Sequence, residues 1–272
     1  MARTVGVSMV RDEEDIIGAT VRHLLGQVDA VLIADNRSID GTRDVLADIE
    51  REHPGRLVVV DDPDPAYRQS EKMTALATRA RLDLGADWIV PFDADEWWYS
   101  PFGRIADVLA GLAAQWLVVP APLFDHVATG HDPDVVDPTE RLGWRCVFPN
   151  PLPKVACRWR PDLVIAQGNH DAYYNGGATR FEELLVVRHF PYRSVEQVVR
   201  KVRNGAEAYS AAGNTIPATF GQHWREWGQL LETWGPPAID ELFHRWYWRA
   251  DPTAPDTVDG LPALIFDPVV QS

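Results

Sequence analysis

The sequence predicts an α/β fold in which a mostly parallel sheet is flanked by helices, followed by a helical, tryptophan-rich C-terminal extension. Through about the first hundred residues, apolar runs of strand length alternate with segments of helical periodicity, and the connections are short. The runs are continuous rather than alternating, which is typical of parallel strands covered on both faces. Five of the eleven tryptophans follow Gly221.

Four strands are expected in the first half, at residues 5–10, 30–34, 57–60 and 88–92. Asp12 is the expected N-cap of the first helix, and Ser70 is the expected N-cap of the third, which Gly85 closes. The second half is less regular. It is expected to hold a helix at 102–114, strands at 116–121, 154–159, 163–166 and 184–190, and a long loop at 125–141. A helix capped by Ser194, with Gln197 in the capping-box position, follows.

The stretch VPFDADEWW at residues 90–98 places Asp93, Asp95 and Glu96 directly after a buried strand. Like charges this close repel one another unless they share a cation or a proton, and carboxylate oxygens are ligands for hard divalent cations. An acidic surface turn is the alternative interpretation. In parallel sheets, ligands bind beyond the carboxyl ends of the strands. Residues 10–12, 35–40, 63–72 and 93–96 are therefore expected to converge on one crevice.

Composition excludes several classes of protein. The net charge of −14 and the pI of about 4.9 argue against a nucleic-acid partner. No apolar stretch reaches the 18 or so residues of a membrane span. The start of the chain lacks a signal-peptide pattern, so the sequence predicts a cytoplasmic protein whose two cysteines, Cys146 and Cys157, are reduced.

The motifs VRDEED, DNRSIDGT, FDADEWW, GNHD and HFPYRS, in this order, resemble family 2 glycosyltransferases of the GT-A fold, which is Rossmann-like. The resemblance covers about residues 5–209. It implies a catalytic domain at 1–212, with a nucleotide-binding half at 1–100 and an acceptor- and metal-completing half at 101–212. The extension at 213–272 would pack on that domain.

The resemblance further implies a UDP-, GDP- or dTDP-linked sugar donor, a small-molecule or glycan acceptor, and Mn²⁺ or Mg²⁺ as cofactor. It makes Asp95 the direct metal ligand, with Asp93 positioning ribose or metal. A histidine completes the site, with His170 favoured and His189 as the alternate. The residues expected to contact the nucleotide-sugar are Val10, Arg11, Glu13, Asp35, Asn36, Lys72, Asp93, Ala94, Arg193 and Lys201.

An inverting transfer needs a general base to accept a proton from the acceptor hydroxyl. Asp171 is the first candidate because it shares a loop with His170, and Asp125 and Glu96 are the others. A retaining enzyme would need no such base, and the sequence leaves the stereochemistry open.

Other functions stay open as alternatives. A sugar-nucleotide pyrophosphorylase would carry a glycine-rich N-terminal loop, which residues 5–15 lack. A metal-dependent hydrolase is kept open by His126 and His131, although HxH and HExxH spacings are missing. A non-catalytic nucleotide- or sugar-binding module is the third alternative. The C-terminal tryptophans are expected to form core, with a sugar-stacking platform or a membrane-surface helix as alternatives.

Overall fold

In the computed structural model, described here for residues 2–213, 217, 221–254 and 263–269, the chain forms two compact units. Unit 1 comprises residues 1–63, 69–123 and 149–189, and unit 2 comprises residues 64–68, 124–148 and 190–272. The predicted domain boundary near residue 212 stays a prediction.

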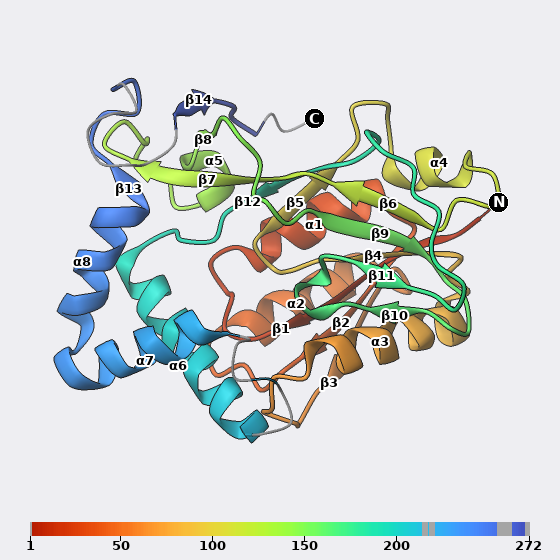
Figure 1. Cartoon of the computed structure of the whole chain (residues 1–272), viewed down its shortest axis with the longest axis horizontal. Helices are drawn as coiled ribbons and strands as arrows, with labels where there is room; N and C mark the ends of the chain where they lie inside the picture. The colour runs from red at the N-terminus through yellow and green to blue at the C-terminus, as the bar shows by residue number, and fades with distance from the viewer. Residues whose placement is uncertain (1, 214–216, 218–220, 255–262, 270–272) are drawn as a thin grey trace. The chain divides into compact units, whose positions relative to one another are not determined.

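Unit 1 is built on a sheet of six strands, among the residues described, in the order β3-β2-β1-β4-β9-β6 (Figure 1). These strands are β1 (Thr4–Val10), β2 (Ala30–Asp35), β3 (Leu57–Asp61), β4 (Trp88–Pro91), β6 (Val118–Ala121) and β9 (Lys154–Arg158). The pairs β1–β2, β2–β3 and β1–β4 are parallel, whereas β9 runs antiparallel to β4 and β6. The mostly parallel sheet predicted from the sequence is confirmed.

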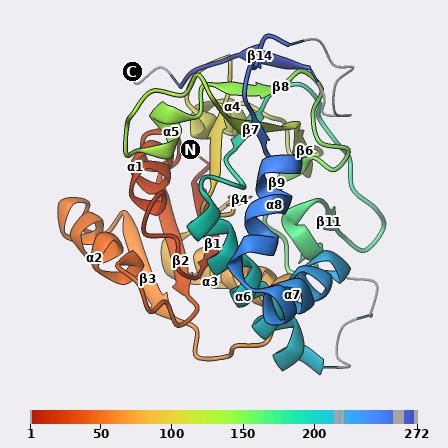
Figure 2. The ribbon, with the colours of Figure 1, turned by 90° about the vertical axis from the view of Figure 1, so that its left-hand side faces the viewer.

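Both faces of this sheet are covered, which explains why its strands are apolar throughout. Side chains of alternate residues in β2 enter different cores. Val31 and Ile33 pack with α1 (Ile17–Gln27) and α2 (Thr42–Glu52), while Leu32 packs with α3 (Gln69–Leu84). Figure 2 shows α3 on the opposite side of the strands from α1 and α2.

The smaller elements of unit 1 complete the surroundings of the acidic motif. Strand β5 (Glu96–Tyr99) pairs antiparallel with β12 (Val186–His189), and β10 (Val164–Ile165) pairs antiparallel with β11 (Ala172–Tyr173). The short helix α4 (Ile105–Ala110) and the 3₁₀ turn η1 (Gln167–Asn169) are the remaining elements. Every parallel strand ends at the edge where the acidic motif begins, so this edge is the place to look for a site.

Unit 2 combines three longer helices with short strands. The helices α6 (Val195–Ala212), α7 (Gln222–Trp234) and α8 (Pro236–Trp246) pack on one another. Strand β7 (Leu123–Thr129), whose residues from Phe124 on lie in unit 2, pairs with β8 (Trp144–Cys146) and β13 (Trp248–Arg249), and β14 (Leu264–Phe266) pairs with β8. Helix α5 (Pro138–Arg141) is a single turn capped by Asp137.

Several local predictions need correction. Asp12 does not cap α1, which begins at Ile17 after a turn, and Ser70 lies inside α3 with its hydroxyl donating to the Ile165 carbonyl. The expected loop at 125–141 contains most of β7 and all of α5, and the expected helix at 102–114 shortens to α4. Ser194 does cap α6, since its Oγ accepts the Gln197 amide at 3.2 Å.

The C-terminal tryptophans contribute less core than predicted. Helix α7 buries none of its residues, and Trp234 and Trp246 are exposed. In α8 the buried residues are Ile239 and Phe243, neither of which is a tryptophan. Both cysteines are free thiols. Across the residues that the structure describes, every helix is too short or too polar to cross a membrane.

The close packing of α1 on β1 depends on Gly6. A Cβ at this position would lie 2.9 Å from Leu24 Cδ2 and 3.3 Å from Phe92 Cε1. We expect Gly6→Ala to lower the free energy of unfolding by about 1–3 kcal/mol, because the overpacked core has to shift. Urea unfolding measures the change.

Gly26 in α1 is the matched control, because a Cβ there meets no described atom within 4 Å. Gly26→Ala should leave stability unchanged or raise it by up to about 1 kcal/mol through helix propensity. Equal losses in the two variants would contradict the packing explanation.

Candidate functional site

The acidic motif forms a tight turn between β4 and β5. The Glu96 amide donates to the Asp93 carbonyl at 3.1 Å, and the Asp93 amide donates to Glu96 Oε2 at 3.1 Å. Trp98 Nε1 donates to the same carboxylate oxygen at 3.1 Å. Glu96 thus holds the turn that presents Asp93 and Asp95, and its side chain is fully buried. Ala94, between the two aspartates, is buried as well.

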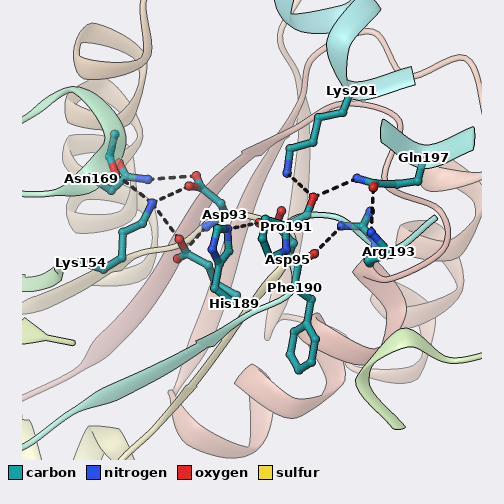
Figure 3. A network of polar contacts seen from close by, with 12 residues as sticks. Asp93, Asp95, Lys154, Asn169, His189, Phe190, Pro191, Arg193, Gln197 and Lys201 are labelled. Carbon is teal, nitrogen blue, oxygen red and sulfur yellow. Dashed lines mark hydrogen bonds and ion pairs between the residues drawn. The ribbon is translucent and has the colours of Figure 1, made fainter. Parts of the chain in front are cut away.

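A buried lysine lies against this turn. Because β9 runs antiparallel to β4, its first residue, Lys154, comes beside the point where β4 ends. Lys154 Nζ lies 2.6 Å from Asp93 Oδ2, 2.7 Å from Glu96 Oε1 and 2.9 Å from the Gly168 carbonyl oxygen. The ammonium donates hydrogen bonds to Asp93 Oδ2 and to the Gly168 carbonyl oxygen, and it forms an ion pair with the Glu96 carboxylate. Figure 3 shows Lys154 and Asn169 both pointing toward Asp93.

Burial and charge act in opposite directions on this ion cluster. Burial lowers the pKa of Lys154, but the carboxylates of Asp93 and Glu96 together outweigh burial and raise it, so the ammonium stays charged. Burial raises the pKa of Glu96 to about 7, and the Lys154 ammonium opposes that rise. A charged group this deeply buried is stable only while its partners remain in place.

Asp95 faces a histidine. In the pairing of β12 with β5, His189 lies opposite Glu96, which brings its ring next to Asp95 (Figure 3). His189 Nε2 lies 3.6 Å from Asp95 Oδ1, and the two side chains are 18% and 4% exposed. This separation exceeds a hydrogen bond and leaves space for an ion that both groups contact.

Asp95 and His189 fit one edge of a divalent cation site, with an oxygen and a nitrogen donor. Asp93 fits less well, because Lys154 already pairs with its carboxylate. Within the described residues no group of three or more His, Cys, Asp or Glu side chains is arranged to hold a metal ion. A divalent ion held by these two side chains would need further oxygen ligands from water or a bound molecule.

His170 lies close to the ion cluster but is held elsewhere. Its Nδ1 is 2.9 Å from the Pro153 carbonyl oxygen, and burial, followed by the Lys154 charge, lowers its pKa. Asn169 beside it is fully buried in a left-handed conformation (φ 58°), and its Nδ2 donates to Asp93 Oδ1 at 3.2 Å. The GNHD motif therefore contacts the acidic motif through Asn169, and the assignment of His170 to the metal stays a prediction.

A second polar cluster lies at the carboxyl ends of β2 and β3. Asn36 Nδ2 donates to Asp62 Oδ2 at 2.8 Å, and Lys72 Nζ pairs with the same oxygen at 2.6 Å. Asp35 is buried, and among the described residues its Oδ1 has no hydrogen-bond partner. A buried carboxylate oxygen without a donor carries a desolvation penalty that a ligand hydroxyl or N–H would relieve.

The loops after β1 and β2 are tied together. Asp12, in a left-handed conformation (φ 55°), accepts the Ile39 amide at 2.7 Å, while its own amide donates to Ser38 Oγ at 3.0 Å. The Glu13 amide donates to Thr42 Oγ1 at 2.8 Å. These bonds join the loop at residues 11–15 to the DNRSIDGT loop at residues 35–42, and the joined pair is called the two-loop lock below. Val10 and Arg11, which were predicted to contact the nucleotide-sugar, lie beside it or in it. The Val10 carbonyl accepts the Asn36 amide, and Arg11 pairs with Asp12.

The remaining predicted residues form contacts of their own in each unit. In unit 1, Asp171 pairs with Arg180 at 2.5 Å. In unit 2, Arg193 donates to the Phe190 carbonyl at 2.9 Å and Lys201 donates to the Pro191 carbonyl at 3.2 Å (Figure 3). Both cations thus hold the segment 190–193.

Asp125 lines a cavity of about 180 Å³ within unit 2. Tyr192 and Tyr247, whose ring centroids are 3.7 Å apart, line the same cavity. The hydrolase alternative gains no support here, because the Nδ1 of His126 is bound to the Leu142 carbonyl at 2.7 Å.

Sequence reasoning missed Lys154, Asn169 and Asp62 as members of these clusters. One signal for Lys154 was available, since it begins the apolar strand KVACR, where a charged residue requires a partner. Asn169 and Asp62 carried no comparable signal, because polar residues at the ends of strands are common.

The mostly parallel sheet flanked by helices is a fold of the GT-A type. Residues 7–125, a little under half of the chain, match the model of the family described as "Glycosyl transferase family 2". The resemblance predicted from the sequence is confirmed.

Among solved structures, the chain is similar to the mannosyltransferase PcManGT from Pyrobaculum calidifontis, in complex with GDP-Man and Mn²⁺. The identity is 16%, 88% of this chain and 73% of that chain are covered, and the TM-score is 0.44. It is also similar to S. aureus TarS 1–349, with 12% identity, coverage of 88% and 82%, and a TM-score of 0.42. No curated protein matches the chain by sequence.

The burial of Lys154 predicts a large stability effect. We expect Lys154→Met to lower the free energy of unfolding by about 3–5 kcal/mol, because it leaves two carboxylates facing each other without their cation. Urea unfolding of the two proteins measures the difference.

Lys72→Met is the matched control. The side chains of Lys72 and Asp62 are 14% and 15% exposed, so water compensates part of the lost pairing. Its loss should be clearly smaller, about 1–2 kcal/mol. A Lys154→Met variant as stable as Lys72→Met would mean that Lys154 is not a structural cation.

Proposed function

We propose that the protein is a metal-dependent glycosyltransferase that moves a sugar from a nucleotide-sugar donor to an acceptor hydroxyl. The observation that carries the proposal is the Asp95–His189 pair beyond the carboxyl end of β4. Asp95 lies within residues 7–125, the segment that matches family 2 glycosyltransferases, and His189 lies in β12. The donor is a UDP-, GDP- or dTDP-linked sugar, and the acceptor is a hydroxyl of a small molecule or a glycan.

The nucleoside part of the donor would lie over the ends of β1, β2 and β3. Asp35 and Asn36 offer an acceptor and an amide at the end of β2, and the buried Asp35 Oδ1 would accept from a ribose hydroxyl or a base N–H. Lys72, held by Asp62, would contribute positive charge toward the phosphates. The two-loop lock built on Asp12 keeps this edge in place before the donor arrives.

Sugar transfer leaves negative charge on the departing diphosphate. Asp95 and His189 would hold a Mn²⁺ or Mg²⁺ ion, which, when bound, supplies Lewis-acid stabilisation of that charge. Glu96 and Lys154 fix the turn that carries Asp95, so the carboxylate is oriented without a ligand. His189 is oriented by its place in β12.

For an inverting transfer, we propose Asp171 as the general base, with Asp125 and Glu96 as the alternatives. Asp171 belongs to unit 1, like the Asp95–His189 pair, and its side chain is 28% exposed, whereas Glu96 is fully buried beside Lys154. A base has to reach the acceptor hydroxyl, which favours the more exposed carboxylate.

Nucleotide-sugars should stabilise the protein only when a divalent ion is present. At about 100 times Kd, UDP-, GDP- or dTDP-glucose or GDP-mannose with Mn²⁺ should raise Tm by about 5 °C or more, since binding then contributes about 2.7 kcal/mol. A thermal-shift panel with and without Mn²⁺, followed by an assay of donor turnover, measures this.

Asp95→Ala and His189→Ala should abolish the metal-dependent part of the shift, and His170→Ala should retain it. No metal-dependent shift with any donor would overturn the proposed function. A shift lost in His170→Ala but kept in His189→Ala would reverse the choice of ligand.

The proposal for the general base is tested on turnover. Asp171→Asn should lower kcat by about 10²–10⁴-fold, the range expected when a base is removed. Asp162→Asn is the matched control, because Asp162 in unit 1 is also paired with an arginine, Arg160. It should change kcat by no more than about fivefold. Equal losses in the two variants would overturn the assignment of Asp171.

A further inference from the structure

We propose that Lys154 is a built-in cation that withdraws Asp93 from the divalent ion. The protein alone then binds that ion weakly, and the ion and the donor nucleotide bind together. This inference rests on the proposed function, because it concerns the same metal site.

The geometry of the ammonium group supports the inference. Its nitrogen lies 2.6–2.9 Å from oxygens of Asp93, Glu96 and Gly168: it donates hydrogen bonds to Asp93 and to the Gly168 carbonyl, and it forms an ion pair with Glu96. The Lys154 side chain is 5% exposed. The other oxygen of Asp93, Oδ1, accepts from Asn169 at 3.2 Å and from Gln69 at 3.4 Å. Both carboxylate oxygens of Asp93 therefore have donors of the protein's own.

Lys154 cannot be displaced as a free ion is. It is covalently attached to β9, whose pairing with β4 and β6 fixes its position. Moving it out would leave Glu96, which is fully buried, without its cation. A divalent ion placed on Asp93 would instead lie close to the ammonium, and like charges in a poorly hydrated site repel strongly.

Asp95 lies beside His189, with its Oδ1 3.6 Å from His189 Nε2. With one carboxylate and one imidazole from the protein, a Mn²⁺ or Mg²⁺ ion would complete its coordination with diphosphate oxygens and water. Metal affinity then depends on the presence of the nucleotide, and nucleotide affinity depends equally on the metal.

The test is a titration of the protein with Mn²⁺ alone, in which the electron paramagnetic resonance signal reports free ion. In Lys154→Met/Glu96→Gln, one positive and one negative charge are removed together, and Asp93 becomes available. We expect this double variant to bind Mn²⁺ about tenfold or more tightly than the unmodified protein, since affinity rises with the number of carboxylate ligands.

Glu96→Gln alone is the matched control, because it keeps Lys154 on Asp93, and its Mn²⁺ affinity should stay near that of the unmodified protein. Equal Mn²⁺ affinity of the unmodified protein and the double variant would overturn the inference. A gain already present in Glu96→Gln would also overturn it.

If the double variant does not fold, the Asp93→Asn variant tests the inference instead. Its Mn²⁺ titration is carried out in the presence of the nucleoside diphosphate that stabilises the protein most. The affinity should change by no more than about threefold, since Asp93 is not a ligand, whereas Asp95→Asn should abolish binding. A loss in Asp93→Asn as large as that in Asp95→Asn would overturn the inference.

The two proposals fail separately. If the unmodified protein binds no Mn²⁺ even with nucleotide, the metal dependence in the proposed function falls. The titration of the double variant with Mn²⁺ alone still tests the proposed role of Lys154, because it measures whether removal of the ammonium creates a metal site at Asp93.

Discussion

The site depends on the desolvation of one ammonium group. Lys154 is removed from water at the start of β9, and its charge is stable there only because Asp93, Glu96 and the Gly168 carbonyl all face it. The same contacts join the end of β4, the start of β9 and the turn η1. If one of these elements shifted, a charge would be left unpaired in the core. Electrostatics thus make the acidic turn one of the most constrained parts of unit 1.

Two polar clusters of unit 1 carry the proposed function. In that proposal, the acidic turn and His189 would hold an ion, while Asp35, Asn36 and Lys72 at the neighbouring strand ends would offer polar groups to a nucleoside and its phosphates. Both clusters lie at the carboxyl edge of one parallel sheet, because β1, β2, β3 and β4 all run in the same direction. Unit 2 holds Asp125 and an aromatic-lined cavity of its own.

The sequence predicted the sheet and its acidic edge well, because both depend on local patterns. Continuous apolar runs mark β1, β2 and β4, and the carboxylates follow directly in the chain. Lys154 escaped prediction because it reaches the turn through the pairing of β9 with β4, across more than sixty intervening residues. The predicted helix N-caps at Asp12 and Ser70 were wrong for a related reason. Asp12 and Ser70 suit an N-cap locally, but each bonds to a distant segment instead: Asp12 to the loop after β2 and Ser70 to the Ile165 carbonyl.

The position of His189 beside Asp95 depends on the register in which β12 pairs with β5. His189 lies opposite Glu96 in a ladder of four paired residues. A slip of a single residue would turn every side chain of β12 to the other face and carry the imidazole away from Asp95. An insertion inside 186–189 would therefore separate the imidazole from Asp95 although the sequence still encodes both residues. Changes of length before Val186, where several residues are exposed, leave this ladder intact. In this protein, the spacing between residues is as much a part of the site as the residues themselves.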